Sequence, residues 1–387
     1  MLAVYVEAAQ PDDPLAALQI GERPEPEPAD GWVVVEVEAA ALNRHDLWSL
    51  AGVGLPPSRM PMILGTDAAG TVDGRPVIVH AVITSADWVG DATFDPKRTL
   101  LSELHQGTMA QRVAVPRANL IDRPDWLSAA QAACLPTAWL TAYRMLTHDS
   151  GLTAGDTVLV QGASGGVASA ATALGKALGL RVWVTGTSEA KRAAALERGA
   201  AAAFEPGARL PERVDAVIET VGEATWSHSL KSLRPGGTVV VCGATSGPNP
   251  PADLNRVFFL QLRVIGSTMG TRQELGELIE LLGRTGLQLL DTTDPTVLQS
   301  IKDTMNLLDD SLSADLARSS HGLDTAMHRR FEVLADYAVG TGAQAILFTC
   351  SAFGSCIDAT TRETPAAISA SQHGGVRPWW LQGSSVT

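Results

Sequence analysis

Residues 156–192 read DTVLVQGASGGVASAATALGKALGLRVWVTGTSEAKR, and this stretch decides the fold. A β-branched run at 157–160 meets a glycine-rich turn at 162–166, which opens a helix rich in small residues. A second β-branched run follows at 182–185. This is the order of strand, turn, helix and strand in a βαβ dinucleotide-binding unit. The sequence therefore predicts a doubly wound parallel sheet of the Rossmann type with a nucleotide at the turn.

The chemistry of the turn suits a pyrophosphate. Small side chains let the backbone approach the anion, and the first turn of the next helix offers unpaired N–H groups and a positive dipole end. The six-residue glycine fingerprint is met strictly only at its middle position, so the flanking strands and helix carry much of this prediction. We expect the cofactor to contact seven residues: Gly162, Ala163, Ser164, Gly165, Gly166, Val167 and, after a later strand, Gly243.

The end of the second strand bears on the choice of cofactor. An NAD site usually has an acidic residue there for the ribose hydroxyls, whereas this chain has Thr187 and Ser188, with Lys191 and Arg192 one turn later. Hydroxyls and cations suit a 2′-phosphate, which favours NADPH over NADH. Two alternatives stay open: Ser188 caps the next helix while the two cations lie on its solvated face, or Glu189 serves an NAD site.

Composition narrows the function classes. The chain has 387 residues, of which 45% are hydrophobic and 18% charged, as expected for an α/β enzyme of two or more domains. Its formal net charge of −13 argues against a nucleic-acid or anionic-membrane partner. The four cysteines lack zinc-ligand spacing and predict no disulfide framework. We expect a cytoplasmic enzyme with a small-molecule substrate, because no targeting or membrane-spanning segment is visible.

The chain divides into three parts. Residues 1–125 show short alternating strands and proline-rich turns, which predict a β-rich domain. Residues 126–286 begin with a helical pattern at 127–148 that Pro136 interrupts, which predicts two helices, and continue with alternating strands and helices. Residues 287–387 lack this alternation and form an atypical C-terminal segment.

Several motifs in family order resemble the medium-chain dehydrogenase/reductase superfamily, in particular its quinone oxidoreductase-like branch. They are ALNRHDLW (41–48), PMILGTDAAGTV (61–72), HQGTMAQRVAVP (105–116), CLPTAWLTAYRML (134–146), the glycine turn and LRPGGTVVVCGATSG (233–247). The resemblance covers about residues 1–284. It implies a chaperonin-10-like barrel domain, a Rossmann domain and a substrate cleft between them. It also implies a homodimer formed through the strand LRVIGST at 262–268.

The same resemblance allows a test for catalytic zinc. At the positions where zinc-dependent members carry Cys, His-Glu and a last Cys or Asp, this chain has Asn43, Thr66-Asp67 and Thr137. Zinc sites prefer nitrogen and sulfur ligands, so we expect no metal. The implied activity is hydride transfer from NADPH to a quinone or an α,β-unsaturated carbonyl, with a proton from water or a pocket hydroxyl. The alternatives are a redox-inert nucleotide-binding protein and a zinc-type alcohol dehydrogenase.

Four residues are the catalytic candidates that the resemblance implies: Asn43, Asp46, Thr137 and Tyr143. Asn43 and Asp46 match the Asn-x-x-Asp of the zinc-free branch, beside the nicotinamide pocket. The alternatives are that Asn43 caps a helix, that Asp46 pairs with Arg44 or His45, and that Tyr143 belongs to the core. Candidate pocket walls are Trp48, Leu55, Met62 and Phe258, although such residues more often form plain core.

The C-terminal segment departs from the family. The closing segment that family members carry is missing after Gly286, and about residues 289–360 resemble the N-terminal half of an aspartate/glutamate racemase, with Cys350 at a strand end. Half of a two-base site cannot racemise, so no racemase activity is expected. The chain is interpreted as a fusion or frame-altered product whose reductase activity is impaired.

Overall fold

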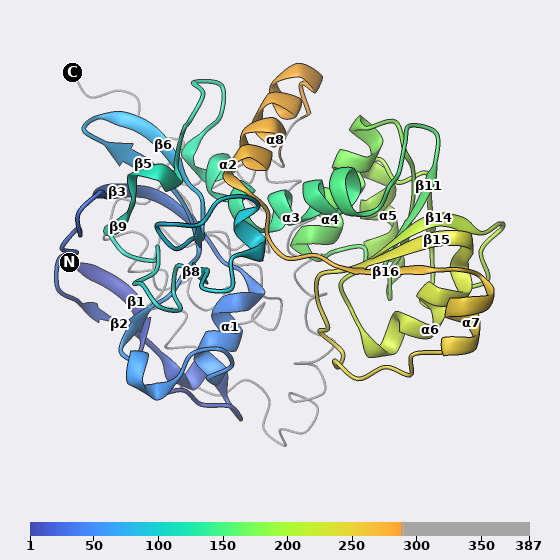
Figure 1. The fold of residues 1–387 in the computed structure, drawn as a ribbon, viewed down its shortest axis with the longest axis horizontal. Coiled ribbons are helices and arrows are strands. Elements are labelled where there is room, and N and C mark those ends of the chain that lie inside the picture. The colour runs from blue at the N-terminus through green and yellow to red at the C-terminus, as the bar shows by residue number, and fades with distance from the viewer. Residues whose placement is uncertain (288, 290–387) are drawn as a thin grey trace, which may run out of the picture. The chain divides into compact units, whose positions relative to one another are not determined.

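The computed structural model describes residues 1–287 and residue 289. Two compact units divide between Thr137 and Ala138 (Figure 1). This division lies after the expected boundary at residue 125, because helix α2 (Ala129–Ala133) contacts strands β3 and β5 of the first unit. The racemase-like segment and Cys350 lie outside the described residues.

The first unit is built from antiparallel strands. A five-stranded sheet has the order β10-β6-β5-β3-β9, a three-stranded sheet has the order β2-β1-β4, and β7 pairs with β8. The strands are β1 (Leu2–Val6), β2 (Leu18–Glu22), β3 (Trp32–Ala41), β4 (Met62–Ile63), β5 (Asp67–Val72), β6 (Arg75–Val79), β7 (Val82–Ile83), β8 (Thr99–Leu100), β9 (Arg112–Pro116) and β10 (Leu120–Asp122). Helix α1 spans Arg44–Ala51. This architecture confirms the expected β-rich domain.

Alternation of side chains explains the core of this unit. Val33 and Val35 of β3 point to the same face and pack with Val113 and Val115 of β9, while Glu36, the next residue, faces solvent. A second cluster gathers around α1, where Leu50 and Leu55 are buried. The first unit thus has two hydrophobic clusters of its own.

The second unit is a parallel six-stranded sheet with helices on both faces. The strand order is β13-β12-β11-β14-β15-β16, so the order reverses beside β11, the first strand. The strands are β11 (Thr157–Val160), β12 (Arg181–Thr185), β13 (Ala202–Phe204), β14 (Val214–Glu219), β15 (Leu233–Val241) and β16 (Arg263–Gly266). Helices α4 (Gly166–Ala177) and α5 (Glu189–Glu197) cover one face, and α6 (Glu223–Ser232) and α7 (Leu254–Phe259) cover the other (Figure 1). The doubly wound Rossmann sheet is confirmed.

Small residues bring α4 close to this sheet, as the sequence predicts. All four residues of β11 are buried. A Cβ atom added at Gly175 would lie 2.6 Å from a methyl group of Val182 on β12. Only glycine permits this approach, which packs the last turn of α4 against the first residues of β12.

The segment at 127–148 differs from the expected pair of α-helices. Helix α2 runs into a π-helical turn at Leu135–Trp139, then α3 (Leu140–Arg144) and a second π-helical turn at Met145–Asp149. Pro136 has no N–H for the regular ladder, and the wider turn accommodates it without ending the helix. The last described helix, α8, spans Arg272–Thr285. No helix of the described residues is long and apolar enough to cross a membrane.

Candidate functional site

The glycine turn has the geometry of a phosphate-binding loop. Gly162 has a φ of +85°, which glycine adopts without strain, and it follows the last residues of β11. Gly165 is the N-cap of α4, and a Cβ atom added there would meet nothing within 4 Å. The helix start therefore has free space on the Cβ side of Gly165, which suits the approach of a pyrophosphate.

Gly243 lies at the carboxyl end of β15, on the side of the sheet where the strand order reverses. A Cβ atom added at Gly243 would be 2.9 Å from the carbonyl oxygen of Thr220, which follows β14. This backbone crowding explains a glycine here. In doubly wound sheets, ligands bind beyond the carboxyl ends of strands at such a reversal.

The cationic residues after β12 surround Gly186. Lys191 is buried and its Nζ donates to the hydroxyl of Thr187, while Arg192 donates to the carbonyl of Gly186 at 2.8 Å. Ser188 is the N-cap of α5, as the alternative interpretation predicted, and its hydroxyl accepts from the Lys191 amide at 3.3 Å. Lys191 does not lie on a solvated face, so that part of the alternative is wrong. Arg192 also forms an ion pair with Glu205 at 3.6 Å.

In the first unit, a polar cluster forms around Asp67. The register of β3 and β5 places Ala41 opposite Asp67, so Asn43, just after β3, reaches the same carboxylate. Asn43 Nδ2 donates to Asp67 Oδ2 at 2.9 Å and to Thr66 Oγ1 at 3.1 Å. Thr66 Oγ1 donates to Asp67 Oδ1 at 3.1 Å, and Thr137 donates to the same carboxylate through its hydroxyl and its amide.

Asp46 binds the backbone on either side of this cluster. Its two carboxylate oxygens accept the backbone amides of Asn43 at 2.7 Å and Gly65 at 2.9 Å. Asn43 is the N-cap of α1, which bears out the capping alternative, although its side chain points to Thr66 and Asp67. Burial raises the pKa of Asp46 to about 6. Through these two hydrogen bonds Asp46 holds the loop before β5 against the start of α1.

The cluster does not fit a zinc ion. Among the four residues at the zinc-ligand positions, Asp67 alone has a side chain that ionises, and its two oxygens accept hydrogen bonds from Asn43, Thr66 and Thr137. The other donors are an amide and two hydroxyls, which are poor zinc ligands. Within residues 1–287 and 289, no group of three or more His, Cys, Asp or Glu residues could hold a metal.

Asp67 gives this site a dependence on pH. Burial raises the pKa of this carboxyl to about 7, while hydrogen bonds from Thr137, Asn43 and Thr66 act in the opposite direction. The unfolded chain, with a pKa near the usual 3.8, loses the proton first as pH rises. The contribution of Asp67 to stability therefore decreases between about pH 4 and pH 7 and is constant above.

Replacement of Asp67 by Asn should remove this contribution. We compare the free energies of unfolding of Asp67→Asn and of the unchanged protein. From pH 5 to pH 7 the difference should shift in favour of Asp67→Asn by roughly 1–2 kcal/mol, with no further shift from pH 7 to pH 8. Urea denaturation at four pH values measures this difference. Parallel pH profiles for the two proteins would show that Asp67 does not titrate in this range.

A second feature of the first unit is the pair formed by His45 and Glu103. His45 Nε2 lies 3.0 Å from Glu103 Oε1, and His45 Nδ1 lies 3.4 Å from Ser102 Oγ. Burial lowers the pKa of His45, but Glu103 and the charges of Asp46 and Asp67 outweigh it, so the net shift is upward. Ser102 and His45 are 57 positions apart in the sequence, which leaves no local signal for this contact.

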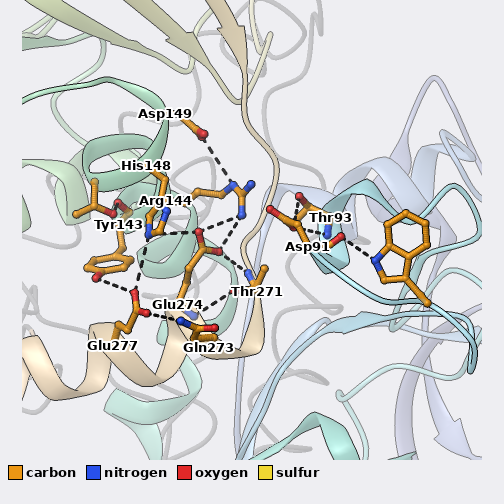
Figure 2. Close-up of polar contacts among 12 residues, drawn as sticks. Asp91, Thr93, Tyr143, Arg144, His148, Asp149, Thr271, Gln273, Glu274 and Glu277 are labelled. Atoms are coloured by element: carbon orange, nitrogen blue, oxygen red, sulfur yellow. Dashed lines mark hydrogen bonds and ion pairs between the residues drawn. The ribbon is translucent and has the colours of Figure 1, made fainter.

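Tyr143 belongs to the second unit and does not join the Asp67 cluster in the described contacts. Its hydroxyl donates to Glu277 Oε2 of α8 at 3.3 Å, and burial and Glu277 raise its pKa. Figure 2 shows Tyr143 beside Arg144, His148 and Glu274 in one polar network. This position favours the core alternative for Tyr143. Of the candidate pocket walls, Leu55 and Met62 are buried core, whereas Trp48 and Phe258 are exposed.

Comparison with known proteins identifies the family. The model for the alcohol dehydrogenase GroES-like domain matches residues 29–125, and the model for zinc-binding dehydrogenase matches residues 166–284. A crotonyl-CoA carboxylase/reductase of Cereibacter sphaeroides is 30% identical over 326 residues, which cover 69% of this chain and 75% of that protein. The chain belongs to the medium-chain dehydrogenase/reductase family. This confirms the resemblance for the part of the chain before the C-terminal segment.

Other members of the medium-chain dehydrogenase/reductase family give the same result. The acryloyl-coenzyme A reductase of Sulfurisphaera tokodaii is 29% identical over 290 residues, with 69% of this chain and 86% of that protein covered. A similar solved structure is that of the 2-octenoyl-CoA carboxylase reductase CinF in complex with NADP and 2-octenoyl-CoA. It has a TM-score of 0.66 at 26% identity, and the match covers 73% of this chain and 79% of that one. The fold class is thus confirmed, and the chain is an oxidoreductase of this family.

Proposed function

We propose that this protein is an NADPH-dependent, metal-free reductase of α,β-unsaturated carbonyl compounds, with thioesters as the favoured substrate class. The observation that carries the proposal is the Asp67 cluster, where hydrogen-bonded oxygen and amide groups fill the positions of zinc ligands. Two relatives are named as reductases of crotonyl-CoA and acryloyl-CoA, which supports the thioester. A quinone stays in the proposal because a human quinone oxidoreductase is also similar, at 28% identity.

The residues of each unit have separate tasks in this proposal. NADPH would supply the hydride to the β-carbon of the substrate. The open space at Gly165 and the N-terminal amides of α4 bind the pyrophosphate, and Lys191 and Arg192 bind the 2′-phosphate. Water supplies the proton for the α-carbon, because the hydroxyl hydrogen of Thr137 is already donated to Asp67.

The direct test is NADPH oxidation with a panel of acceptors. We expect turnover with a short enoyl-CoA, weaker turnover with a quinone, and no alcohol oxidation. Chelation with EDTA should leave the rate unchanged. Tight NADPH binding without turnover on any acceptor would support the redox-inert alternative, and a rate that depends on added zinc would support the alcohol dehydrogenase alternative.

Lys191 should decide between the two nicotinamide cofactors. Replacement of Lys191 by Ala removes a buried cation beside Thr187, and we expect the Kd for NADPH to rise by about 10- to 100-fold because bonds to charged groups contribute about 1.5–3 kcal/mol. The Kd for NADH should change by less than about threefold. Fluorescence titration measures both constants. An equal loss for the two cofactors would place Lys191 outside a 2′-phosphate site.

We also propose a homodimer through the edge strand β16. This strand pairs only with β15 among the described strands, and Val264 on it is half exposed. Exposed Phe258 and Phe259 of α7 lie shortly before it in the chain. A second copy that pairs with this edge would cover its free backbone groups and the apolar side chains.

Substitution of Val264 by Asp should weaken this dimer. We expect the mass in light scattering to fall from dimer toward monomer at micromolar concentration, because the charge would be buried in the interface. Val53→Asp, at an exposed valine of the first unit, is the matched control and should leave the mass unchanged. A dimer that survives Val264→Asp unaltered rules out this edge.

A further inference from the structure

Beneath the glycine turn, a buried chain of polar side chains connects β11, β12, β14 and α6. It contains Gln161, Thr185, Glu219 and Ser229, none of which is more than 2% exposed. A buried amide, hydroxyl or carboxylate costs free energy unless it is hydrogen-bonded. Apolar side chains would fill the same space without that cost, so the hydrogen bonds of these polar groups must serve another purpose.

One end of this chain meets the turn itself. The amide of Gly162 donates to Thr185 Oγ1 at 3.2 Å, and Thr185 Oγ1 donates to Gln161 Oε1 at 2.7 Å. Gln161 is the residue immediately before Gly162, and its backbone N–H donates to the carbonyl oxygen of Ile218 of β14 at 3.0 Å. The N–H of Gly162 is therefore directed into the protein, toward β12.

The other end of the chain fixes the orientation of the Gln161 amide. Ser229 Oγ donates to Glu219 Oε2 at 2.6 Å, so it accepts from Gln161 Nε2 at 2.9 Å. The second hydrogen of Nε2 faces His228 Nδ1 at 3.0 Å, while His228 Nε2 faces the carbonyl of Ala208 at 2.8 Å. Each donor thus has one acceptor, and Gln161 Oε1 must point to Thr185.

We propose that Thr185 and Gln161 are positioning residues of the nucleotide site. They hold the N–H of Gly162 away from the ligand and fix its left-handed backbone, so that the space at Gly165 and the first amides of α4 stay open for the pyrophosphate. This inference rests on the proposed NADPH site. A chain of hydrogen bonds in a buried setting polarises its members, which makes it a stiff support for a turn.

Three variants separate positioning from general stability. Thr185→Val keeps the shape of the side chain but removes both the acceptor for Gly162 and the donor for Gln161. Thr185→Ser restores the hydroxyl. Thr172→Val is the matched control, because Thr172 is also buried and its hydroxyl bonds to Ala168 within α4, without contact to the turn.

NADPH titration of these proteins, together with KM for the acceptor and a thermal melt, tests the proposal. We expect Thr185→Val to raise the Kd for NADPH by about tenfold with the acceptor KM unchanged, and Thr185→Ser to recover most of the affinity. A loss of affinity no greater than that of Thr172→Val would overturn the proposal. If the unchanged protein does not bind NADPH, the proposed function itself fails, which is a distinct outcome.

Hydrogen exchange on the unchanged protein gives a second test that does not depend on the folding of Thr185→Val. The amide of Gly162 should exchange at least about tenfold more slowly than those of Gly165 and Gly166 in the absence of ligand, because it is bonded to a buried hydroxyl. Equal exchange rates at these three glycines would contradict the positioning role.

Discussion

Replacement of Gly165 by Leu should abolish NADPH binding and leave the fold intact. A Cβ atom at Gly165 meets nothing within 4 Å, and its backbone lies at φ −65°, where any residue is allowed. The leucine side chain would fill the space that the pyrophosphate needs. We expect the Kd for NADPH to rise at least about 100-fold, or roughly 3 kcal/mol, with the melting temperature within about 2 °C of the unchanged protein.

Gly276→Leu is the matched control for this experiment. Gly276 lies in α8, and a Cβ atom added there also meets nothing within 4 Å. The control should retain full NADPH affinity. If Gly165→Leu binds NADPH as tightly as Gly276→Leu does, the nucleotide is not bound at the start of α4.

Loss of the Glu274 carboxylate should destabilise the second unit more than any surface change. Glu274 is nearly buried in α8 and accepts from Arg144 Nη1 at 2.9 and 3.0 Å, and it closes the N-terminal cap of α8 by accepting the Thr271 amide at 2.6 Å (Figure 2). Removal of one partner of a buried ion pair typically costs about 3–5 kcal/mol. We expect a loss of about 3 kcal/mol for Glu274→Ala in chemical denaturation.

Glu277→Ala serves as the control because Glu277 lies in the same helix and contacts Tyr143, but its side chain is 37% exposed. Its removal should cost less than about 1 kcal/mol. Equal losses for Glu274→Ala and Glu277→Ala would show that the Arg144–Glu274 pair does not hold α8 against α3. Full retention of stability in Glu274→Ala would contradict the buried-pair argument altogether.

Local patterns predicted the second unit well. The strand over 157–160 matches β11 (Thr157–Val160), and the expected strand at 182–185 matches β12 within one residue. Buried parallel strands and glycine turns are local features of the sequence, so they can be recognised without knowledge of the rest of the chain. The segment with Pro136 differed because a helical pattern with a proline does not show whether the helix ends there or widens into a π-helical turn.

The site in the first unit was predicted only in part. The resemblance indicated Asn43, Asp46 and Thr137, but Asp67 entered as a missing zinc ligand and not as the centre of a cluster. Its role follows from two contacts between distant parts of the sequence. Strand pairing places Ala41 of β3 opposite Asp67 of β5, and Thr137 donates a hydrogen bond to Asp67. Gln161 and Thr185 gave no signal for the same reason, because their contact requires β11 and β12 to be adjacent.

Transfer of deuterium from NADPH shows whether this protein reduces an enoyl thioester without a metal. The protein, freed of metal with EDTA, would be incubated with crotonyl-CoA and NADPH that carries two deuterium atoms at C4 of the nicotinamide, and the product analysed by mass spectrometry. We expect a saturated thioester with one deuterium at the β-carbon. Formation of no product, or of product only after zinc is added, would contradict a metal-free reductase.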